Sequence, residues 1–241
     1  MNNFISYDLY KKYSVLNETY DSYIDLKKLA QIILRKTENK EIKSNETYFI
    51  KDLVDIEKSD TYKMIQDVAI RLYFPNFEFS GSFLPPTAFN RTNAQLKKYG
   101  LLNELQFSKG LIIIHGNKYE RILHELSHAY NWYRSKGKNS NMPLKKSYQA
   151  PGLSGDQFNR RYYNSTEEIH SFFLETISKL DFFDENGHIK NINNLYNEFK
   201  KIFGVHYELW NTFLTPKVKK ILAHKFAQYY HKLKERNISD E

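Results

Sequence analysis

Apolar residues recur at helical spacing in the first third of the chain. Asp25, a residue type that caps helices, stands before apolar positions three and four residues apart, at Leu26, Leu29, Ala30, Ile33 and Leu34. This pattern predicts a packing helix, and residues 1–60 are expected to be mainly helical. A similar pattern over residues 64–72 predicts a second helix that ends before Pro75.

Two short segments have the pattern of strands. Phe77-Glu78-Phe79 alternates apolar and charged side chains, and Gly81, Pro85 and Pro86 then mark a loop. Residues 110–116 hold a run of isoleucines between two glycines, which predicts a second strand.

Helical patterns dominate the rest of the chain. A helix is predicted from about Asn117 to Arg134, followed by a polar loop from Gly137 to Gly155 that could wall a cleft. A further helix should begin at Asn164 or Ser165 and run to about Leu180. Two more are expected, one near Ile192 to Phe203 and one that begins at the cap and first-turn pair Thr215-Pro216.

No repeat, low-complexity segment or linker divides the sequence, so we expect one domain over residues 1–241. Within it, residues 1–60 would form a helical N-terminal part, residues 61–180 the core, and residues 181–241 a helical C-terminal part. A few strands among many helices predict an α+β fold. The apolar content of 41% and the aromatic content of 16% agree with a folded chain.

Composition narrows the chemistry and the location. The chain has no cysteine, which excludes disulfides, thiolate zinc clusters and a cysteine nucleophile, so a bound metal must use histidines, carboxylates and water. No window approaches the roughly 18 apolar residues of a membrane span, and the first residues do not resemble a Sec signal peptide. We therefore expect no transmembrane segment, and a protein that is cytoplasmic, packaged in a virion or injected.

The formal charge of +8 allows nucleic acid, an anionic membrane surface or an acidic protein as a partner. The basic residues are scattered in short pairs, so nucleic acid is allowed but not favoured. The segment from Lys217 to Arg236 is the stretch that could anchor a nucleic acid.

The strongest chemical signal is His124-Glu125-Leu126-Ser127-His128. Histidines four residues apart project from one face of a helix and can share a zinc ion, while the glutamate can act as general base. The apolar residues of this helix fall almost opposite the histidines, so we expect one buried face and one face that offers ligands. In such a site zinc polarises the scissile carbonyl and activates water, and Glu125 carries the proton to the leaving amine.

A third protein ligand is needed, because a catalytic zinc site has three and leaves the remaining position to water. The segment from Tyr163 to Phe173 offers Glu167 and Glu168 at the start of a helix. If Asn164 caps this helix, Glu167 points back at the backbone and Glu168 is free; if Ser165 caps it, the roles reverse. The residues alone leave both registers open.

The segment from Ile122 to Tyr130 resembles the active-site helix of zincin metallopeptidases, and Glu168-Ile169-His170-Ser171 resembles the Glu-x-x-Ala/Ser helix of the gluzincin branch. The similarity covers about Gly110 to Leu180. It implies a zincin-like core, made of a small mixed sheet and an active-site helix, with helical N- and C-terminal additions. It also implies Zn²⁺ held by His124, His128 and Glu168, with Glu125 as the catalytic base.

The same resemblance implies that Ile112 to His115 form an edge strand along which an extended substrate lies, although the sequence equally allows a buried core strand. A hydrogen-bond donor should stabilise the oxyanion near the zinc. We assign this role to His170 and Tyr163, from the candidates Tyr148, Arg160, Arg161, Tyr162, Tyr163 and His170.

The sequence therefore predicts a zinc-dependent metallopeptidase that hydrolyses peptide bonds in a protein or peptide. Two alternatives stay open. One is a non-catalytic or structural zinc-binding protein of an assembly such as a virion or secretion apparatus. The other is a protease that acts on nucleic-acid-associated proteins.

Overall fold

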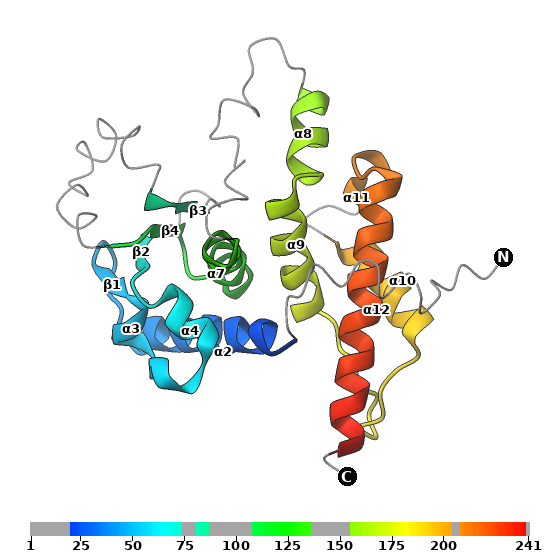
Figure 1. Ribbon diagram of the computed structural model, residues 1–241, viewed down its shortest axis with the longest axis horizontal. Helices are drawn as coiled ribbons and strands as arrows, with labels where there is room; N and C mark the ends of the chain where they lie inside the picture. The colour runs from blue at the N-terminus through cyan, green and yellow to red at the C-terminus, as the bar shows by residue number, and fades with distance from the viewer. Residues whose placement is uncertain (1–19, 74–80, 87–107, 136–154, 204–207, 240–241) are drawn as a thin grey trace.

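The computed structural model describes residues 20–73, 81–86, 108–135, 155–203 and 208–239 (Figure 1). In these residues helices dominate and four short strands form one mixed sheet, so the predicted α+β class is confirmed. The predictions for residues 77–79 and for the loop before Gly155 lie outside the described residues.

The sheet has the strand order β1-β2-β4-β3. Its central strands, β2 and β4, are parallel, and each outer strand is antiparallel to its neighbour. The strands are Thr47–Phe49 (β1), Ala69–Tyr73 (β2), Gly81–Leu84 (β3) and Leu111–His115 (β4). The strand predicted within residues 110–116 is therefore confirmed as β4.

Of the two alternatives left open for Ile112 to His115, the buried core strand is confirmed, and the edge strand implied by the resemblance is not. β4 lies between β2 and β3, and Ile112 and Ile114 are fully buried, as expected of an interior strand. The edge strand beside β4 is β3. The sequence predicts a loop here from Gly81, Pro85 and Pro86, and that prediction is wrong for residues 81–84. The prolines lie just beyond the last residue of the strand, where they interrupt no pairing within β3.

The helix predicted over residues 64–72 is only partly present. Ser59 caps α4 (Asp60–Ile65) through its hydroxyl, but α4 ends at Ile65 and the chain then enters β2. Val68, Ile70 and Leu72 are all fully buried, and this spacing of two places them on one face of a strand. The sheet environment thus overrides the helical spacing of the same apolar residues.

Residues 20–60 belong to the same core and are not purely helical. α2 (Tyr20–Glu38) begins before Asp25, so Asp25 is not its N-cap. Asp25 instead accepts a hydrogen bond from the Ser59 hydroxyl, which joins α2 to the start of α4. The chain between these helices contains β1, α3 (Ile50–Leu53) and η1 (Ile56–Lys58).

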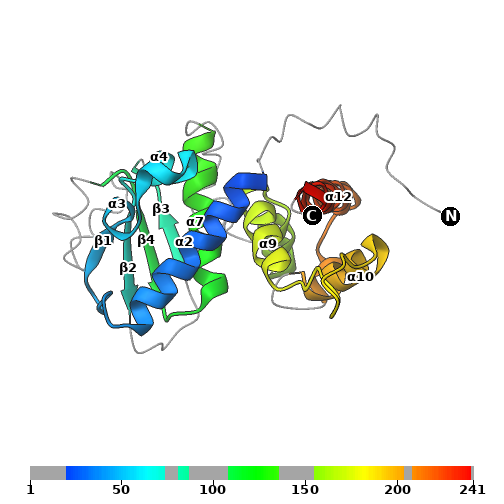
Figure 2. The same cartoon turned by 90° about the horizontal axis from the view of Figure 1, so that it is seen from below.

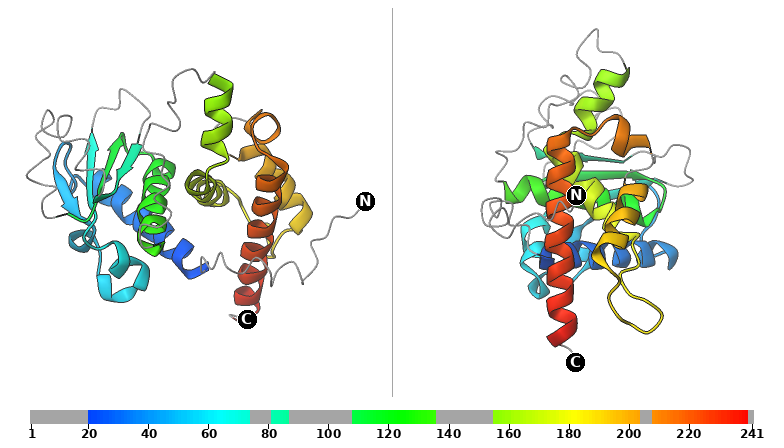
Figure 3. Two further views of the ribbon diagram at one scale, coloured as in Figure 1. Left: turned by 45° about the horizontal axis from the view of Figure 1, so that its top comes forward. Right: turned by 90° about the vertical axis from the view of Figure 1, so that its right-hand side faces the viewer.

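α7 (Tyr119–Arg134) is the central helix of the molecule. It packs on β3 and β4 and contacts α2 and α4, which share one apolar core with the inner face of the sheet (Figure 2). On its other side α7 packs along α9 (Thr166–Ser178), and α12 (Pro216–Ser239) lies beyond α9 (Figure 3). The order of layers is therefore sheet, α7, α9 and α12.

The remaining helices support α9. α8 (Gly155–Tyr163) leads directly into it, α10 (Ile192–Ile202) packs against α9 and α12, and α11 (Glu208–Thr212) precedes α12. The predicted helices near 192–203 and from Thr215-Pro216 are confirmed, whereas α8 is not predicted by the sequence. Within the described residues, none of the helices combines the length and apolar character that crossing a bilayer requires.

Candidate metal centre

His124, His128 and Glu168 converge between α7 and α9, and we refer to them as the acid–histidine cluster. The two Nε2 atoms are 3.1 Å apart. Glu168 places Oε2 at 3.3 Å from His124 Nε2 and Oε1 at 3.6 Å from His128 Nε2. A tetrahedral zinc ion with bonds of about 2.0 to 2.1 Å separates its ligand atoms by about 3.3 Å. The three separations bracket that value.

The histidines meet because they lie one turn apart on α7, but this face is not turned to solvent as the helical wheel suggests. Residues 122–130 are all buried. The apolar residues among them face the sheet, α2 and α4, while the histidines face α9. The two faces of α7 are thus both covered, one by an apolar core and one by a helix that carries carboxylates.

Glu168 reaches the cluster although Ser165 caps α9. The Ser165 hydroxyl accepts from the Glu168 N–H, which is the register that the capping argument associates with Glu167 as the free carboxylate. The Ser165 N–H donates to the Tyr162 carbonyl, so it does not need the Glu168 side chain as an acceptor. Glu168 is therefore released toward the histidines. The side chain of Glu167 lies outside what the structure describes.

Each histidine has an acceptor beside its second ring nitrogen. The Ser171 hydroxyl is 3.3 Å from His128 Nδ1, and Glu175 Oε2 is 3.5 Å from His124 Nδ1. Ser171 and Glu175 follow Glu168 at helical spacing on α9 and are buried. Protons on both Nδ1 atoms would leave the two Nε2 lone pairs facing the Glu168 carboxylate. The sequence did not identify Ser171 or Glu175 in this role.

Two polar atoms of this region are left without a hydrogen bond. Glu168 Oε2 and His124 Nδ1 are buried without a hydrogen-bond partner, although each lies near a group of suitable type. Burial lowers the pKa of His124, but the carboxylates of Glu168 and Glu175 outweigh it and raise that pKa to about 10. Burial likewise raises the pKa of Glu168, yet its histidine neighbours hold it below the ordinary value. The cluster therefore favours a positive charge at its centre.

Two histidines and one carboxylate are a donor set that suits zinc, and buried, unsatisfied acceptors at these separations fit a divalent cation. The residues present therefore fit a zinc ion.

Glu125 lies beside the cluster without joining it. Its side chain is 3% exposed, and burial raises its pKa, while the charges of His124 and His128 act in the opposite direction. Gly81, the first residue of β3, approaches so closely that a Cβ there would stand 2.6 Å from Glu125 Oε1. The absence of a side chain at Gly81 thus leaves the space that the Glu125 carboxylate occupies.

Tyr162 is the tyrosine most closely linked to the cluster. Burial raises the pKa of its hydroxyl, and the charge of Glu168 and a hydrogen bond with that residue add to the effect. Tyr163, which the sequence predicts as an oxyanion donor, packs its ring at a tilt against Phe172 and Phe213, and burial and the Glu168 charge raise its pKa. Tyr148 lies outside the described residues, and Arg160 and Arg161 are exposed on α8.

His170 projects from a different face of α9 than Glu168. Its Nδ1 lies 2.5 Å from Lys225 Nζ on α12, and Lys225 also donates to the Tyr23 hydroxyl at 3.3 Å. We refer to Tyr23, His170 and Lys225 as the lysine cluster. All three are buried. The structure thus places the predicted oxyanion donor His170 in a second polar group, on the α12 side of α9.

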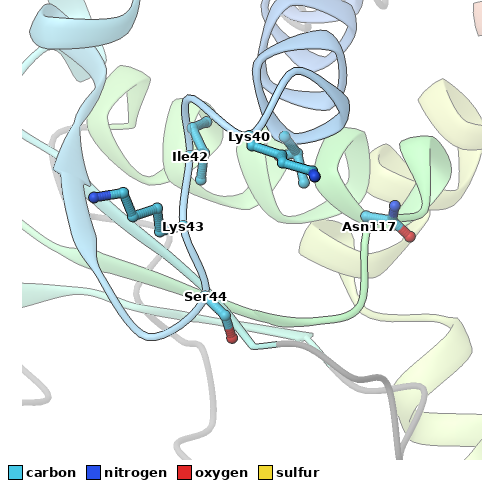
Figure 4. Close-up of a pocket in the computed structure, with 6 residues that line it drawn as sticks. Lys40, Ile42, Lys43, Ser44 and Asn117 are labelled. Atoms are coloured by element: carbon cyan, nitrogen blue, oxygen red, sulfur yellow. The ribbon is translucent and has the colours of Figure 1, made fainter.

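Two hollows elsewhere on the described surface hold none of these side chains. One, of about 370 Å³, lies between the end of α2 and the segment before α7 (Figure 4). The Lys40 amine points toward Asn117 there, while the Lys43 amine points away. The other, of about 440 Å³, runs along α2 beside Arg35. Neither contributes to the candidate metal centre.

Comparisons of the chain with protein-family models, with curated proteins and with solved structures give no match. The resemblance to zincins therefore stays a prediction, and the choice of a function depends on the geometry of this site.

Proposed function

We propose that the protein is a zinc-dependent metallopeptidase. The observation that carries the proposal is the convergence of three buried acceptors, from His124, His128 and Glu168, with the carboxyl of Glu125 beside them. A purely structural site needs no free carboxylate next to its ligands, whereas hydrolysis needs a base that is not itself a ligand. The same proposal includes a zincin-like core around this site.

A zinc ion bound by these three residues would polarise a scissile carbonyl and lower the pKa of water. Glu125 is placed to move the proton. It takes a proton from water as the water oxygen bonds to the carbonyl carbon, and it delivers that proton to the nitrogen as the C–N bond breaks. Burial, which raises the pKa of its carboxyl, makes both transfers easier near neutral pH.

Other residues would orient the reactants. The Tyr162 hydroxyl stays protonated because its pKa is raised, so it can donate a hydrogen bond to the carbonyl oxygen as charge develops. Ser171 and Glu175 fix the rotation of the two imidazole rings. In the described part of the chain β3 pairs only with β4, so its other edge can accept an extended peptide near Glu125.

The direct test is Glu125→Gln. We expect the purified protein to carry about one zinc per chain by elemental analysis, and the variant to keep that zinc but to lose cleavage of a broad peptide library. Glu120→Gln, the same change five residues earlier on α7, is the matched control and should keep both. A metal-free native preparation, or full cleavage by Glu125→Gln, contradicts the proposal.

One observation favours a structural zinc site as the second candidate. The three ligands are 2%, 5% and 8% exposed and come from two packed helices, so a metal would join α7 to α9. Tight zinc binding with no cleavage of the library by the native protein, and no effect of Glu125→Gln, would support this function instead.

A further inference from the structure

Arg121 and the candidate catalytic base Glu125 both lie on α7, and their side chains meet beside Gly81, the first residue of β3. Arg121 precedes Glu125 by one turn of α7, and its Cδ would be 2.9 Å from a Cβ at Gly81, the same position that Glu125 Oε1 approaches. The two side chains therefore lie next to each other against the first residue of the edge strand. This places a guanidinium within the surroundings of the proposed reaction.

No hydrogen bond or ion pair within the described part of the chain holds this guanidinium. Arg71 and Arg134, which are half-buried like Arg121, both have interaction partners. Glu125 is near enough for the two charges to act on each other, but it does not form an ion pair with Arg121. A half-buried arginine normally has an acceptor, because withdrawing its charge from water is otherwise unfavourable.

The guanidinium has five N–H donors in a planar fork that matches a carboxylate. Gly81 has no side chain, and the space beside it is taken by the side chains of Glu125 and Arg121, so both groups come close to the backbone at the start of the edge strand. Because Arg121 lies one helical turn from Glu125, a carboxylate bound to it would lie close to the bond being cleaved.

We propose that Arg121 binds a carboxylate of the substrate, so that the preferred peptides carry an acidic side chain or a free C-terminus close to the scissile bond. This inference rests on the proposed function and adds a substrate class to it. Arg121 acts by direct contact with the substrate and does not hold the metal.

The test measures peptide binding to the zinc-loaded Glu125→Gln protein by calorimetry. Four versions of one peptide combine a free or amidated C-terminus with an internal Glu or Gln, so that the two sources of carboxylate are separated. We expect at least one carboxylate form to bind about tenfold more tightly than the neutral form, and this preference to disappear when Arg121→Gln is added. Arg121→Lys should retain part of it, since the charge remains but the fork is lost.

Arg35→Gln, an equivalent change on α2, is the matched control and should keep the full preference. Equal binding of all four peptides, no binding of any, or a preference that survives Arg121→Gln overturns the inference. Cleavage of a broad library by the native protein without preference for acidic or free-C-terminal peptides would overturn this inference alone. Zinc content and circular dichroism show that each variant is folded, and a native protein without zinc or cleavage would instead count against the metallopeptidase.

Discussion

The two faces of α9 carry two buried polar clusters, one made up of hydrogen-bond acceptors and one that contains a lysine. Toward α7 lies the acid–histidine cluster, in which acceptors from three side chains face one another. Toward α12 lies the lysine cluster, in which the chain itself supplies the ammonium of Lys225. Both groups are buried by the same helix, so burial alone does not explain the difference.

The contrast lies in where the positive charge comes from. Lys225 donates to Tyr23 and lies against the ring of Phe173, with its ammonium 5.6 Å from the ring centre. In the described part of the chain, Glu168 has no lysine or arginine partner, and its neighbours are the two histidines. A buried group of acceptors without a lysine or arginine from the described part of the chain is the arrangement expected of a site that takes a divalent cation from solution.

Of the variants considered, removal of the Glu168 side chain should lower zinc affinity most. Glu168→Ala deletes a ligand, and we expect zinc affinity to fall by more than about 100-fold, because even the loss of a group behind a ligand costs 10- to 100-fold. Competition against a chromogenic chelator measures the affinity. Zinc at 1,000 times its Kd should also stabilise the native protein by about 4 kcal/mol, and at the same zinc concentration Glu168→Ala should reduce this gain to about 1.4 kcal/mol or less.

Glu167→Ala is the matched control, and it should bind zinc as the native chain does. If Glu167→Ala lost zinc and Glu168→Ala kept it, the third ligand would be assigned to the wrong carboxylate. If both variants bound zinc normally, the acid–histidine cluster would not be the metal site.

Glu175→Gln should have the next largest effect. The change keeps the size of the side chain but removes the charge that faces His124 Nδ1, so the imidazole becomes a weaker ligand. We expect zinc affinity to fall by about 10- to 100-fold. Lys179→Met, which removes the ion-pair partner of Glu175 without touching the histidine, should change it less. Unchanged affinity in Glu175→Gln would show that this carboxylate does not orient His124.

The acid–histidine cluster could be predicted from local sequence because each of its parts is local. The histidine spacing places two candidate ligands one turn apart on α7, and a helix start rich in glutamates offers the candidate for the third. The choice between Glu167 and Glu168 could not be made from the helix cap alone. It depends on whether the Ser165 N–H needs an acceptor, and the Tyr162 carbonyl already provides one.

The lysine cluster could not be predicted in the same way. His170 was considered for the metal side because it lies two residues from Glu168, but its Lys225 partner is 55 residues further along the chain. Sequence spacing gives the faces of α9 but not which helix covers each face. The choice between an edge strand and a core strand for residues 112–115 was open for a similar reason, since only the pairing with β3 shows that β4 is interior.

Ser171→Ala should have a smaller effect than Glu175→Gln. The Ser171 hydroxyl is neutral and 3.3 Å from His128 Nδ1, and its hydrogen bond contributes about 0.5 to 1.5 kcal/mol. We therefore expect zinc affinity to fall about three- to tenfold, measured with the same chelator. Ser178→Ala, on the same helix but bonded to the Glu175 carbonyl, is the control. A loss as large as that of Glu168→Ala would mean that Ser171 maintains the packing of α9 and does more than orient one ring.

Lys225→Met should change zinc affinity least, and it tests whether the two faces of α9 are independent. Methionine can keep the contact with Phe173, but the Tyr23 hydroxyl loses its donor, which should lower the free energy of unfolding by about 1 to 3 kcal/mol. Urea denaturation of the zinc-loaded protein measures that loss. Zinc affinity should stay within about threefold of the native value, because additivity holds for groups that share no partner. A variant that unfolds normally but binds zinc poorly would show that Lys225 sets the position of α9, and that the metal site depends on α12 as much as on α7.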